Sequence, residues 1–301
     1  MPMFYNTPNN TRWLFIKESL SEKDKIPLTN ILFLGESRVN AAIDFTQFKN
    51  SYSFASGGAT PIEMYYILTK YLKNNKTPDT LFYSISPRFL TETFGFYDYA
   101  IRNNLFTYND ITEINKNYKN HPQDTVLGNY FMLKYLAYSA NYIEYYQSDV
   151  NHNHLIGAYK KNLKFIEENK QLNGGRPHPG LKDSCSSLNY ETIYIDFTPS
   201  PLLTFYLEET FRLCRKNNIH IIFEFMPMNK SSYNKLTPKF ITSYKLYIQN
   251  LAIQFPNYQI SDSVYFYNDS FFGDASHLNS KGKKKYTKYL KTLIGNNSNV
   301  N

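Results

Sequence analysis

The stretch ILFLGESR, residues 31–38, decides the fold of this 301-residue chain. Its four apolar residues run directly into Gly35, a pattern typical of a buried strand that ends in a tight turn. The turn leads to Ser37, where we expect the next helix to begin. A strand with no polar face, followed at once by a helix, is the repeating unit of parallel sheets that are covered on both faces. The stretch therefore predicts the first strand of an α/β protein.

The rest of the chain repeats this alternation. Further strands are predicted at 52–55, 80–85 and 219–225, with a short edge strand at 258–260. Helical periodicity is found at residues 61–72, 201–214, 239–253 and 280–293. The first of these helices opens with Thr60 as N-cap and Pro61 at the first helical position. Strands that alternate with helices of this length predict an α/β fold, a three-layer sandwich with a central parallel sheet.

The alternation is interrupted between residues 94 and 195. This segment is rich in Tyr and Asn, is mostly helical in pattern, and contains the turn-like NGGRPHPG at 173–180. We interpret residues 1–301 as a single α/β domain, with residues 94–195 as a helical, Tyr-rich insertion or cap within it.

Composition narrows the class of protein. The hydrophobic fraction of 42% fits a globular chain, and the net charge of +8 favours acidic partners such as anionic glycans, anionic lipid surfaces or nucleic acid. Two cysteines, Cys185 and Cys214, are too few for a disulfide framework or a multi-cysteine zinc site. The chain has no phosphate-binding loop and no dinucleotide fingerprint. We therefore expect no cofactor and no metal.

The sequence predicts no membrane-spanning segment. No stretch approaches the apolar length that a bilayer requires, and residues 1–30 lack the apolar core of a signal peptide. We expect a soluble chain, either a cytoplasmic protein or an extracytoplasmic one from which an N-terminal anchor has been removed.

Two separate segments carry residues suited to nucleophilic catalysis. Ser37 follows the first predicted strand, where a serine can attack a substrate while nearby N–H groups hold the oxyanion. The segment GDASHLNSKGKKKY, residues 273–286, places Asp274 three residues before His277. Histidine is the usual base for serine, and an aspartate orients its ring. The alternatives are a helix N-cap for Ser37 and an ordinary loop for the Asp–His pair.

Together these segments resemble the SGNH (GDSL-type) hydrolase superfamily. Residues 35–37, Gly-Glu-Ser, stand where that family has its Gly-Asp-Ser block, and SGGAT at 56–60 looks like its second, glycine-bearing block. DASHL at 274–278 is similar to its final Asp-x-x-His-Leu block. The order and spacing agree over nearly the whole chain, with residues 94–195 as an insertion. The resemblance implies a catalytic triad of Ser37, His277 and Asp274; we expect Glu36, in place of the family's Asp, to support the turn.

The third block departs from the family pattern. The family usually has Gly-x-Asn-Asp after the third strand, and the Asn side chain donates to the oxyanion, but this chain has SISPRF at 84–89. That text is similar to the Ser-Pro-Gln-Trp-Phe segment of teichoic-acid D-alanylation proteins and of related bacterial proteins that acylate or deacylate surface polysaccharides. We expect the oxyanion donors to be Ser37, Gly58 and Arg88. Substrate binding or a surface ion pair is the alternative for Arg88.

The resemblance implies a function and a location. It implies a serine esterase or O-acyltransferase that acts on an acylated glycan or another acyl ester in the bacterial cell envelope, with the cytoplasm as the alternative location. A catalytically inactive carbohydrate-binding or assembly protein of the same fold is the alternative function, supported by the missing Asn. The Lys-rich helix at 280–293 is either a solvated face or a contact for an anionic polymer or membrane surface. We expect no nucleic acid partner.

Overall fold

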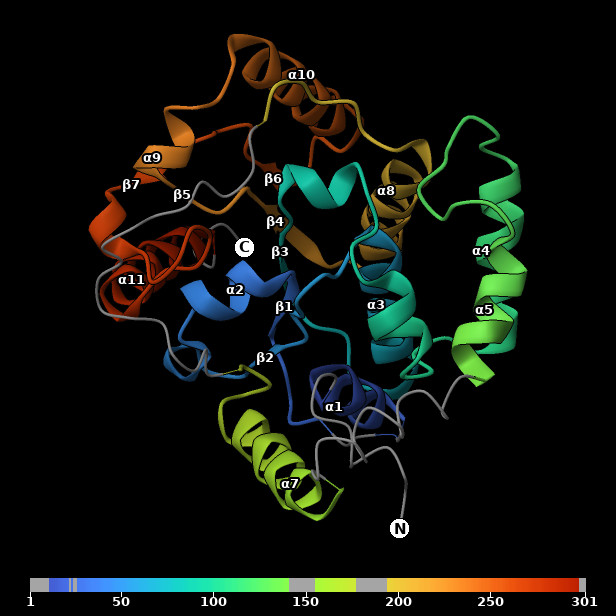
Figure 1. Ribbon diagram of the computed structural model, residues 1–301. Helices are drawn as coiled ribbons and strands as arrows, with labels where there is room; N and C mark the ends of the chain where they lie inside the picture. The colour runs from blue at the N-terminus through green and yellow to red at the C-terminus, as the bar shows by residue number, and fades with distance from the viewer. Residues whose placement is uncertain (1–10, 22, 24–25, 141–154, 177–193, 298–301) are drawn as a thin grey trace.

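The computed structural model describes residues 11–21, 23, 26–140, 155–176 and 194–297 (Figure 1). The first half contains α1 (Thr11–Leu20), β1 (Ile31–Gly35), α2 (Ser37–Ala42), β2 (Ser51–Ser53), α3 (Pro61–Asn74), β3 (Thr80–Ser84), α4 (Tyr108–Lys119) and α5 (Phe131–Ala140). The second half contains α7 (Leu155–Gln171), α8 (Pro201–Lys216), β4 (His220–Phe223), β5 (Met228–Asn229), α9 (Lys230–Tyr233), α10 (Pro238–Gln254), β6 (Gln259–Ile260), β7 (Phe266–Tyr267) and α11 (Ser280–Asn297).

A five-stranded parallel sheet forms the centre of the molecule. Its strand order is β2-β1-β3-β4-β6, and every neighbouring pair is parallel. Each of the five predicted strands overlaps one of these strands, and the four predicted helices coincide with α3, α8, α10 and α11. Thr60 is the N-cap of α3, with Pro61 as its first residue. The prediction of an α/β fold with a central parallel sheet is confirmed.

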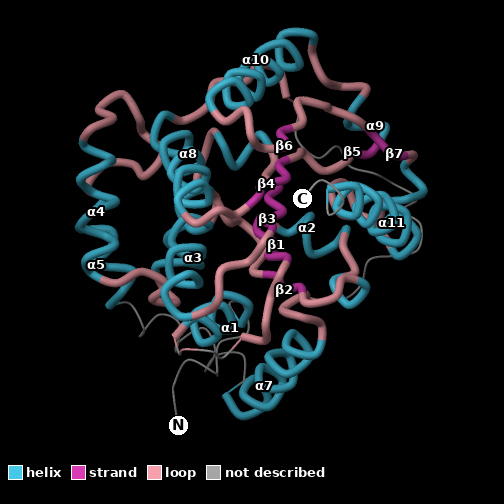
Figure 2. The backbone as a smooth tube through the Cα atoms, turned by 180° about the vertical axis from the view of Figure 1, so that it is seen from behind, coloured by secondary structure: helices cyan, strands magenta, loops and turns pink. Residues whose placement is uncertain are grey.

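Alternating side chains of the strands build two separate cores. In β1, Leu32 and Leu34 belong to a core shared with α1, α3, α8 and α10, whereas Phe33 belongs to a core shared with α2 and α11. Phe82 of β3 and Ile222 of β4 lie on the Phe33 side. Successive strand residues point to opposite faces, so the sheet is covered on both (Figures 1 and 2). The layers are therefore helix, sheet and helix.

The described helices of segment 94–195 lie in two separate parts of the molecule. Helices α4 and α5 lie outside α3 and α8, whereas α7 lies beside α1 (Figures 1 and 2). The contact between α7 and α1 includes a hydrogen bond from Thr11 Oγ1 to Asn162 Oδ1 at 2.9 Å. Residues 141–154 and 177–193 lie outside the described part of the chain. An insertion spanning 94–195 therefore stays a prediction.

The structure bears on the expected absence of a disulfide framework and of a membrane-spanning segment. Cys214 is a buried free thiol on α8, and burial raises its pKa, while Cys185 lies outside the described residues. Among the described helices, none combines the length and the apolar character that crossing a bilayer requires.

Gly35 sets the geometry at the carboxyl edge of the sheet. Its φ is +142°, and a Cβ at this position would overlap the carbonyl oxygen of Ser84 on the adjacent strand β3. Only glycine adopts this backbone at so close an approach. The absent side chain lets β1 turn directly into α2 beside the end of β3.

We expect Gly35→Ala to lower the free energy of unfolding by about 1–3 kcal/mol or more, because the added methyl overlaps a backbone carbonyl. The control is Gly295→Ala on α11, where an added Cβ meets nothing within 4 Å. That substitution should be neutral or stabilising, since alanine favours a helix. Chemical denaturation measures both variants, and equal stabilities would contradict the constraint.

Candidate active site

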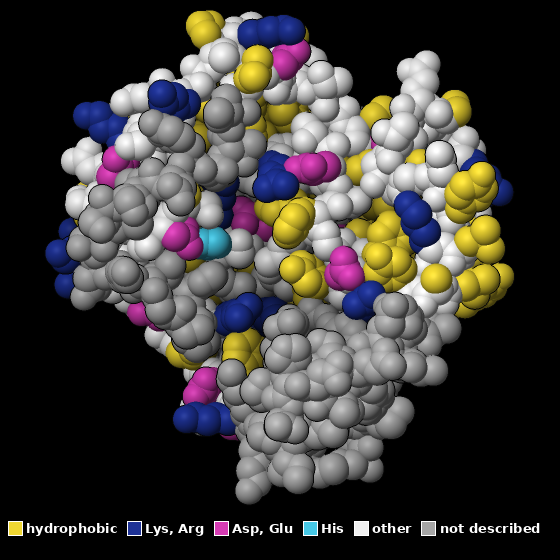
Figure 3. All heavy atoms as spheres, viewed as in Figure 1, with side chains coloured by type: hydrophobic (Ala, Val, Ile, Leu, Met, Phe, Trp, Pro, Cys, Tyr) yellow, Lys and Arg dark blue, Asp and Glu magenta, His cyan; other side chains and the backbone are white. Residues whose placement is uncertain are grey.

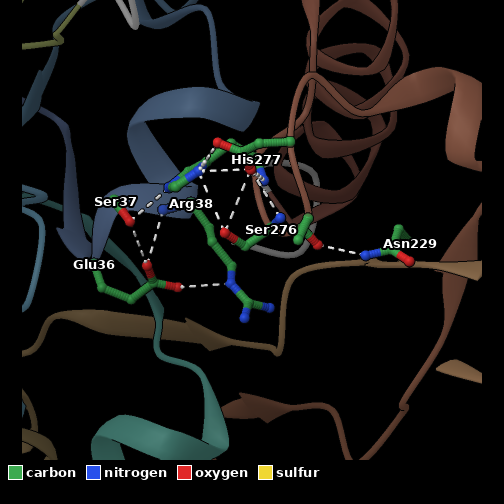
Figure 4. Close-up of polar contacts among 8 residues, drawn as sticks. Glu36, Ser37, Arg38, Asn229, Ser276 and His277 are labelled. Atoms are coloured by element: carbon green, nitrogen blue, oxygen red, sulfur yellow. Dashed lines mark hydrogen bonds and ion pairs between the residues drawn. The ribbon is translucent and has the colours of Figure 1, made fainter. Parts of the chain in front are cut away.

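Ser37 is the first residue of α2. Glu36 is the N-cap, and its Oε2 accepts the backbone N–H of Arg38 at 2.9 Å, while Arg38 Nε lies 3.4 Å from the other carboxylate oxygen. The prediction that Glu36 supports the turn is therefore confirmed, and the alternative that Ser37 is the N-cap is wrong. The Ser37 hydroxyl lies 3.1 Å from the same Glu36 Oε2, which is therefore one acceptor for its proton (Figure 4).

The second segment folds into a loop that is closed by its own aspartate. Asp274 Oδ1 accepts the N–H groups of Ser276 and His277, both at 2.8 Å. The N–H of Gly273 donates to the His277 carbonyl at 2.9 Å. From outside the loop, Asn229 Nδ2 donates to the carbonyl of Ala275 (Figure 4). These contacts fix the direction of the His277 ring.

The structure brings Ser37, His277 and Asp274 into hydrogen-bond contact. His277 Nε2 lies 2.8 Å from Ser37 Oγ, across 240 residues of sequence. His277 Nδ1 lies 2.8 Å from Asp274 Oδ2 and 3.0 Å from Oδ1. Because a carboxylate only accepts, Nδ1 carries the proton and Nε2 presents its lone pair to Ser37. This arrangement can remove a proton from the serine.

The surroundings favour the ionised form of Asp274. Burial alone raises its pKa, but the hydrogen bond and charge attraction from His277, with the N–H groups of Ser276 and His277, outweigh burial. The pKa therefore lies well below its usual range. A charged Asp274 also stabilises the imidazolium that His277 becomes after taking a proton.

Helix α11 holds the loop of residues 273–277 against the sheet. Asn279 Oδ1 accepts the N–H of Gly282 at 3.0 Å in its first turn. Tyr286 Oη and Tyr289 Oη both donate to the carboxylate of Glu224, which directly follows β4, the latter at 2.9 Å. Burial raises the pKa of Glu224. The carboxylate thus ties α11 to the sheet edge where Ser37 lies.

A pocket of about 270 Å³ opens beside Ser37. Figure 3 shows acidic, basic, histidine and hydrophobic side chains exposed together near the middle of this face. The lining residues come from α1, from the start of α2, from segments 56–58 and 84–89, and from segment 94–195: Arg12, Trp13, Ser37, Ser56, Gly57, Gly58, Phe89, Phe94, Tyr99 and Arg176.

Several hydrogen-bond donors at the pocket have no partner among the described residues. The N–H groups of Ser37, Gly57 and Gly58 donate no hydrogen bond there. The hydroxyl of Ser56 is likewise buried and without a partner. Gly58 has φ +74°, and a Cβ on it would crowd the Phe94 carbonyl and the Tyr99 ring. Unpaired donors around a nucleophile can hold a developing oxyanion.

Arg88 lies in a different position from the one expected of an oxyanion donor. Its Nε pairs with Glu92, four residues on, and its guanidinium lies over the Phe94 ring at 5.1 Å. Among the described residues that line the pocket, Arg88 is not present. This is the surface ion pair that the sequence left open, because residues four apart meet on one turn. The oxyanion role of Arg88 gains no support from this arrangement.

Sequence reasoning missed three pocket residues: Arg12, Trp13 and Arg176. Arg12 and Trp13 belong to α1, in which eight of ten residues are buried, so no polar face marks the helix. Arg176 lies in the segment NGGRPHPG, where only a turn was expected. No local sequence pattern predicts that these residues lie at the pocket, because only folding brings them close to Ser37.

The C-terminal lysines divide between two environments. Lys285 lies over the rings of Tyr267 and Phe271, at 4.2 and 4.7 Å. Lys283 is partly buried, and burial lowers its pKa. The other lysines on α11 are exposed: Lys281, Lys284, Lys288 and Lys291. Contact of this helix with an anionic polymer or membrane stays a prediction.

Neither a protein-family model nor a curated protein matches this chain. The site is therefore interpreted from its own residues.

We expect Asp274→Asn to destabilise the protein at neutral pH and to have less effect in acid. A carboxyl whose pKa falls on folding stabilises above its unfolded pKa of about 3.9, and that contribution is lost as pH falls further. The Asp274 side chain is 48% exposed, so solvent screening limits the loss in free energy of unfolding at pH 7 to about 1 kcal/mol. Urea denaturation at pH 7 and pH 3 measures it.

Asp98→Asn provides the control, because Asp98 is exposed and pairs with Arg102 only at 3.6 Å. Its effect should be smaller at pH 7. A stability difference for Asp274→Asn that stays constant from pH 7 to pH 3 would contradict the stabilised carboxylate.

Proposed function

We propose that the chain is an SGNH-type serine hydrolase or O-acyltransferase that acts on acyl esters of a cell-surface glycan. The observation that carries the proposal is the 2.8 Å contact between His277 Nε2 and Ser37 Oγ, with Asp274 on the other ring nitrogen. The motif order of residues 35–37, 56–60 and 274–278 supports the assignment to this superfamily. The cell-envelope location and residues 94–195 as an insertion belong to the same proposal.

The reaction begins with attack of Ser37 on the ester carbonyl. As the Oγ–C bond forms, the hydroxyl proton passes to His277 Nε2, and Asp274 stabilises the imidazolium. The tetrahedral intermediate then collapses, the ester C–O bond breaks, and His277 returns the proton to the departing alkoxide. The acyl group remains on Ser37.

The second half of the reaction moves the acyl group to an acceptor. His277 takes a proton from water or from a sugar hydroxyl, and that oxygen attacks the acyl carbonyl. The second tetrahedral intermediate then collapses, the bond between the acyl carbon and Ser37 Oγ breaks, and His277 returns the proton to Ser37. Phe94 and Tyr99 line the pocket beside Ser37. An aromatic wall of this kind suits the faces of a sugar ring. Hydrolysis and transfer therefore share one set of residues and differ in the acceptor.

The intermediate needs donors at its oxyanion. The N–H groups of Ser37 and Gly58 meet that need from a helix start and a glycine turn, and the N–H of Gly57 lies beside them. We assign the side-chain donor, which the family takes from an Asn, to the hydroxyl of Ser56. It is fully buried, lines the pocket and has no partner among the described residues.

A fluorophosphonate probe, which labels activated serines, tests the proposal. We expect labelling of the wild type, none of Ser37→Ala, and a labelling rate reduced by about 10²- to 10⁴-fold in His277→Ala. Hydrolysis of 4-nitrophenyl acetate should fall in parallel. Circular dichroism verifies that the variants fold. A wild type that is neither labelled nor active would instead support an inactive carbohydrate-binding or assembly protein.

Ser56→Ala should lower kcat by about 10²- to 10³-fold with little change in KM, since an oxyanion donor acts only in the transition state. The matched control is Ser84→Ala, a buried serine that also lacks a hydroxyl partner but does not line the pocket. Arg88→Ala should also remain close to wild type. Loss of kcat in Arg88→Ala alone would return the oxyanion role to Arg88.

A further inference from the structure

The pocket beside Ser37 contains a buried guanidinium with no carboxylate partner in the described part of the chain. Arg12 is 4% exposed. Burial lowers its pKa to about 9. Its hydrogen bonds with described residues go to neutral oxygens: Ala55 O, Ser53 O, Gly174 O and Asn169 Oδ1. A buried charge without a counterion is unfavourable. An anion nearby would relieve that cost.

A second guanidinium, that of Arg176, lies at the same pocket and donates no hydrogen bond to the described residues. No hydrogen bond joins Arg176 to any residue that the structure describes, and its Nε is buried. The group lies over the Phe165 ring at 5.2 Å, and burial lowers its pKa. Its charge also lowers the pKa of Arg12, so the two positive groups repel each other. Repulsion between two like charges of the same pocket lowers stability unless a ligand compensates it.

We propose that this pocket is an anion subsite and that the substrate carries an acidic group, a carboxylate or a phosphate, close to its acyl ester. The inference rests on the proposed function. Arg176 supplies the hydrogen bonds, because a guanidinium presents a planar fork that matches carboxylate and phosphate oxygens. Arg12 supplies charge alone, since its donors are committed to the backbone and to Asn169. Trp13, Phe94 and Tyr99 line the remaining wall.

The alternative is that both arginines serve only the fold. Arg12 does serve it, because its contacts with residues 53, 55 and 174 join α1 to two loops. Arg176 makes no such contact with a described residue, and a structural role within the described part of the chain does not explain a buried Nε that has no partner there. Arg176 is therefore the residue that separates the two explanations.

Binding to the Ser37→Ala protein tests the subsite without dependence on turnover. Three methyl galactosides that differ only at C6 serve as probes: the neutral alcohol, the 6-carboxylate (methyl galacturonoside) and the 6-phosphate. Ligand-detected NMR titration gives each Kd at low salt. We expect both anions to bind at least about tenfold more tightly than the neutral sugar, since hydrogen bonds to charged groups contribute about that much or more. The stronger of the two anions identifies the acidic group.

Substitutions of Arg176 in the same background complete the test. Arg176→Gln should remove the preference for anions, and Arg176→Lys, which keeps the charge but loses the fork, should retain part of it. Arg215→Gln, which removes an exposed charge at the end of α8, should leave the preference unchanged. Thermal unfolding verifies that each variant folds.

Equal affinity for all three sugars, detectable or not, would overturn the subsite, and so would an anion preference that survives Arg176→Gln. These outcomes are separable from failure of the proposed function. If the protein prefers anions but fluorophosphonate does not label the wild type, the anion subsite is supported and the proposal that the chain is an enzyme is rejected. If fluorophosphonate labels the wild type but the protein shows no preference for anions, only the anion subsite is rejected.

Discussion

The close approach of Gly35 to the carbonyl of Ser84 is the constraint on which the site depends. Without a Cβ, β1 ends against β3 and turns at once, so α2 begins at residue 37. The first turn of a helix leaves N–H groups without partners, and Ser37 places its own among them. The same turn lets Glu36, and not Ser37, cap the helix. The Ser37 hydroxyl therefore lies between two acceptors, Glu36 Oε2 at 3.1 Å and His277 Nε2 at 2.8 Å.

The carbonyl of Ala55 connects the pieces around that turn. It accepts two hydrogen bonds from Arg12, at 3.0 and 2.7 Å, and one from Asn40 Nδ2 at 2.6 Å. Helix α1, helix α2 and the loop after β2 thus meet at one oxygen. Because residues 56–58 follow directly, the same oxygen positions the glycine turn beside Ser37. The pocket wall and the N–H groups beside Ser37 are therefore held in place by shared contacts.

Local patterns predicted the elements, since their signals are short-range, whereas the meeting of Ser37 with His277 across 240 residues was expected only from the resemblance of residues 35–37 and 274–278 to two family blocks. Apolar runs marked β1, β3 and β4, and the spacing of Asp274 and His277 lies within one loop. Local spacing could also have predicted the ion pair of Arg88, because Glu92 follows it by four residues. Local sequence patterns did not predict that helix α1 and Arg176 contribute to the pocket. Arg12 reaches Asn169 and Gly174 across 157 and 162 residues, and no local pattern encodes a contact of that range.

The charges around Ser37 divide into two groups with opposite effects on the proposed chemistry. Asp274 favours the imidazolium that forms when His277 takes the serine proton, whereas the guanidiniums of Arg12 and Arg176 favour the oxyanion and oppose a further positive charge. An acidic group bound at the arginines would offset part of their charge before the proton moves. The empty pocket would then be less ready for proton transfer than the occupied one. The acidic group of the substrate would thus favour the imidazolium and weaken the support that the arginines give to the oxyanion, so its two effects on attack by Ser37 oppose each other.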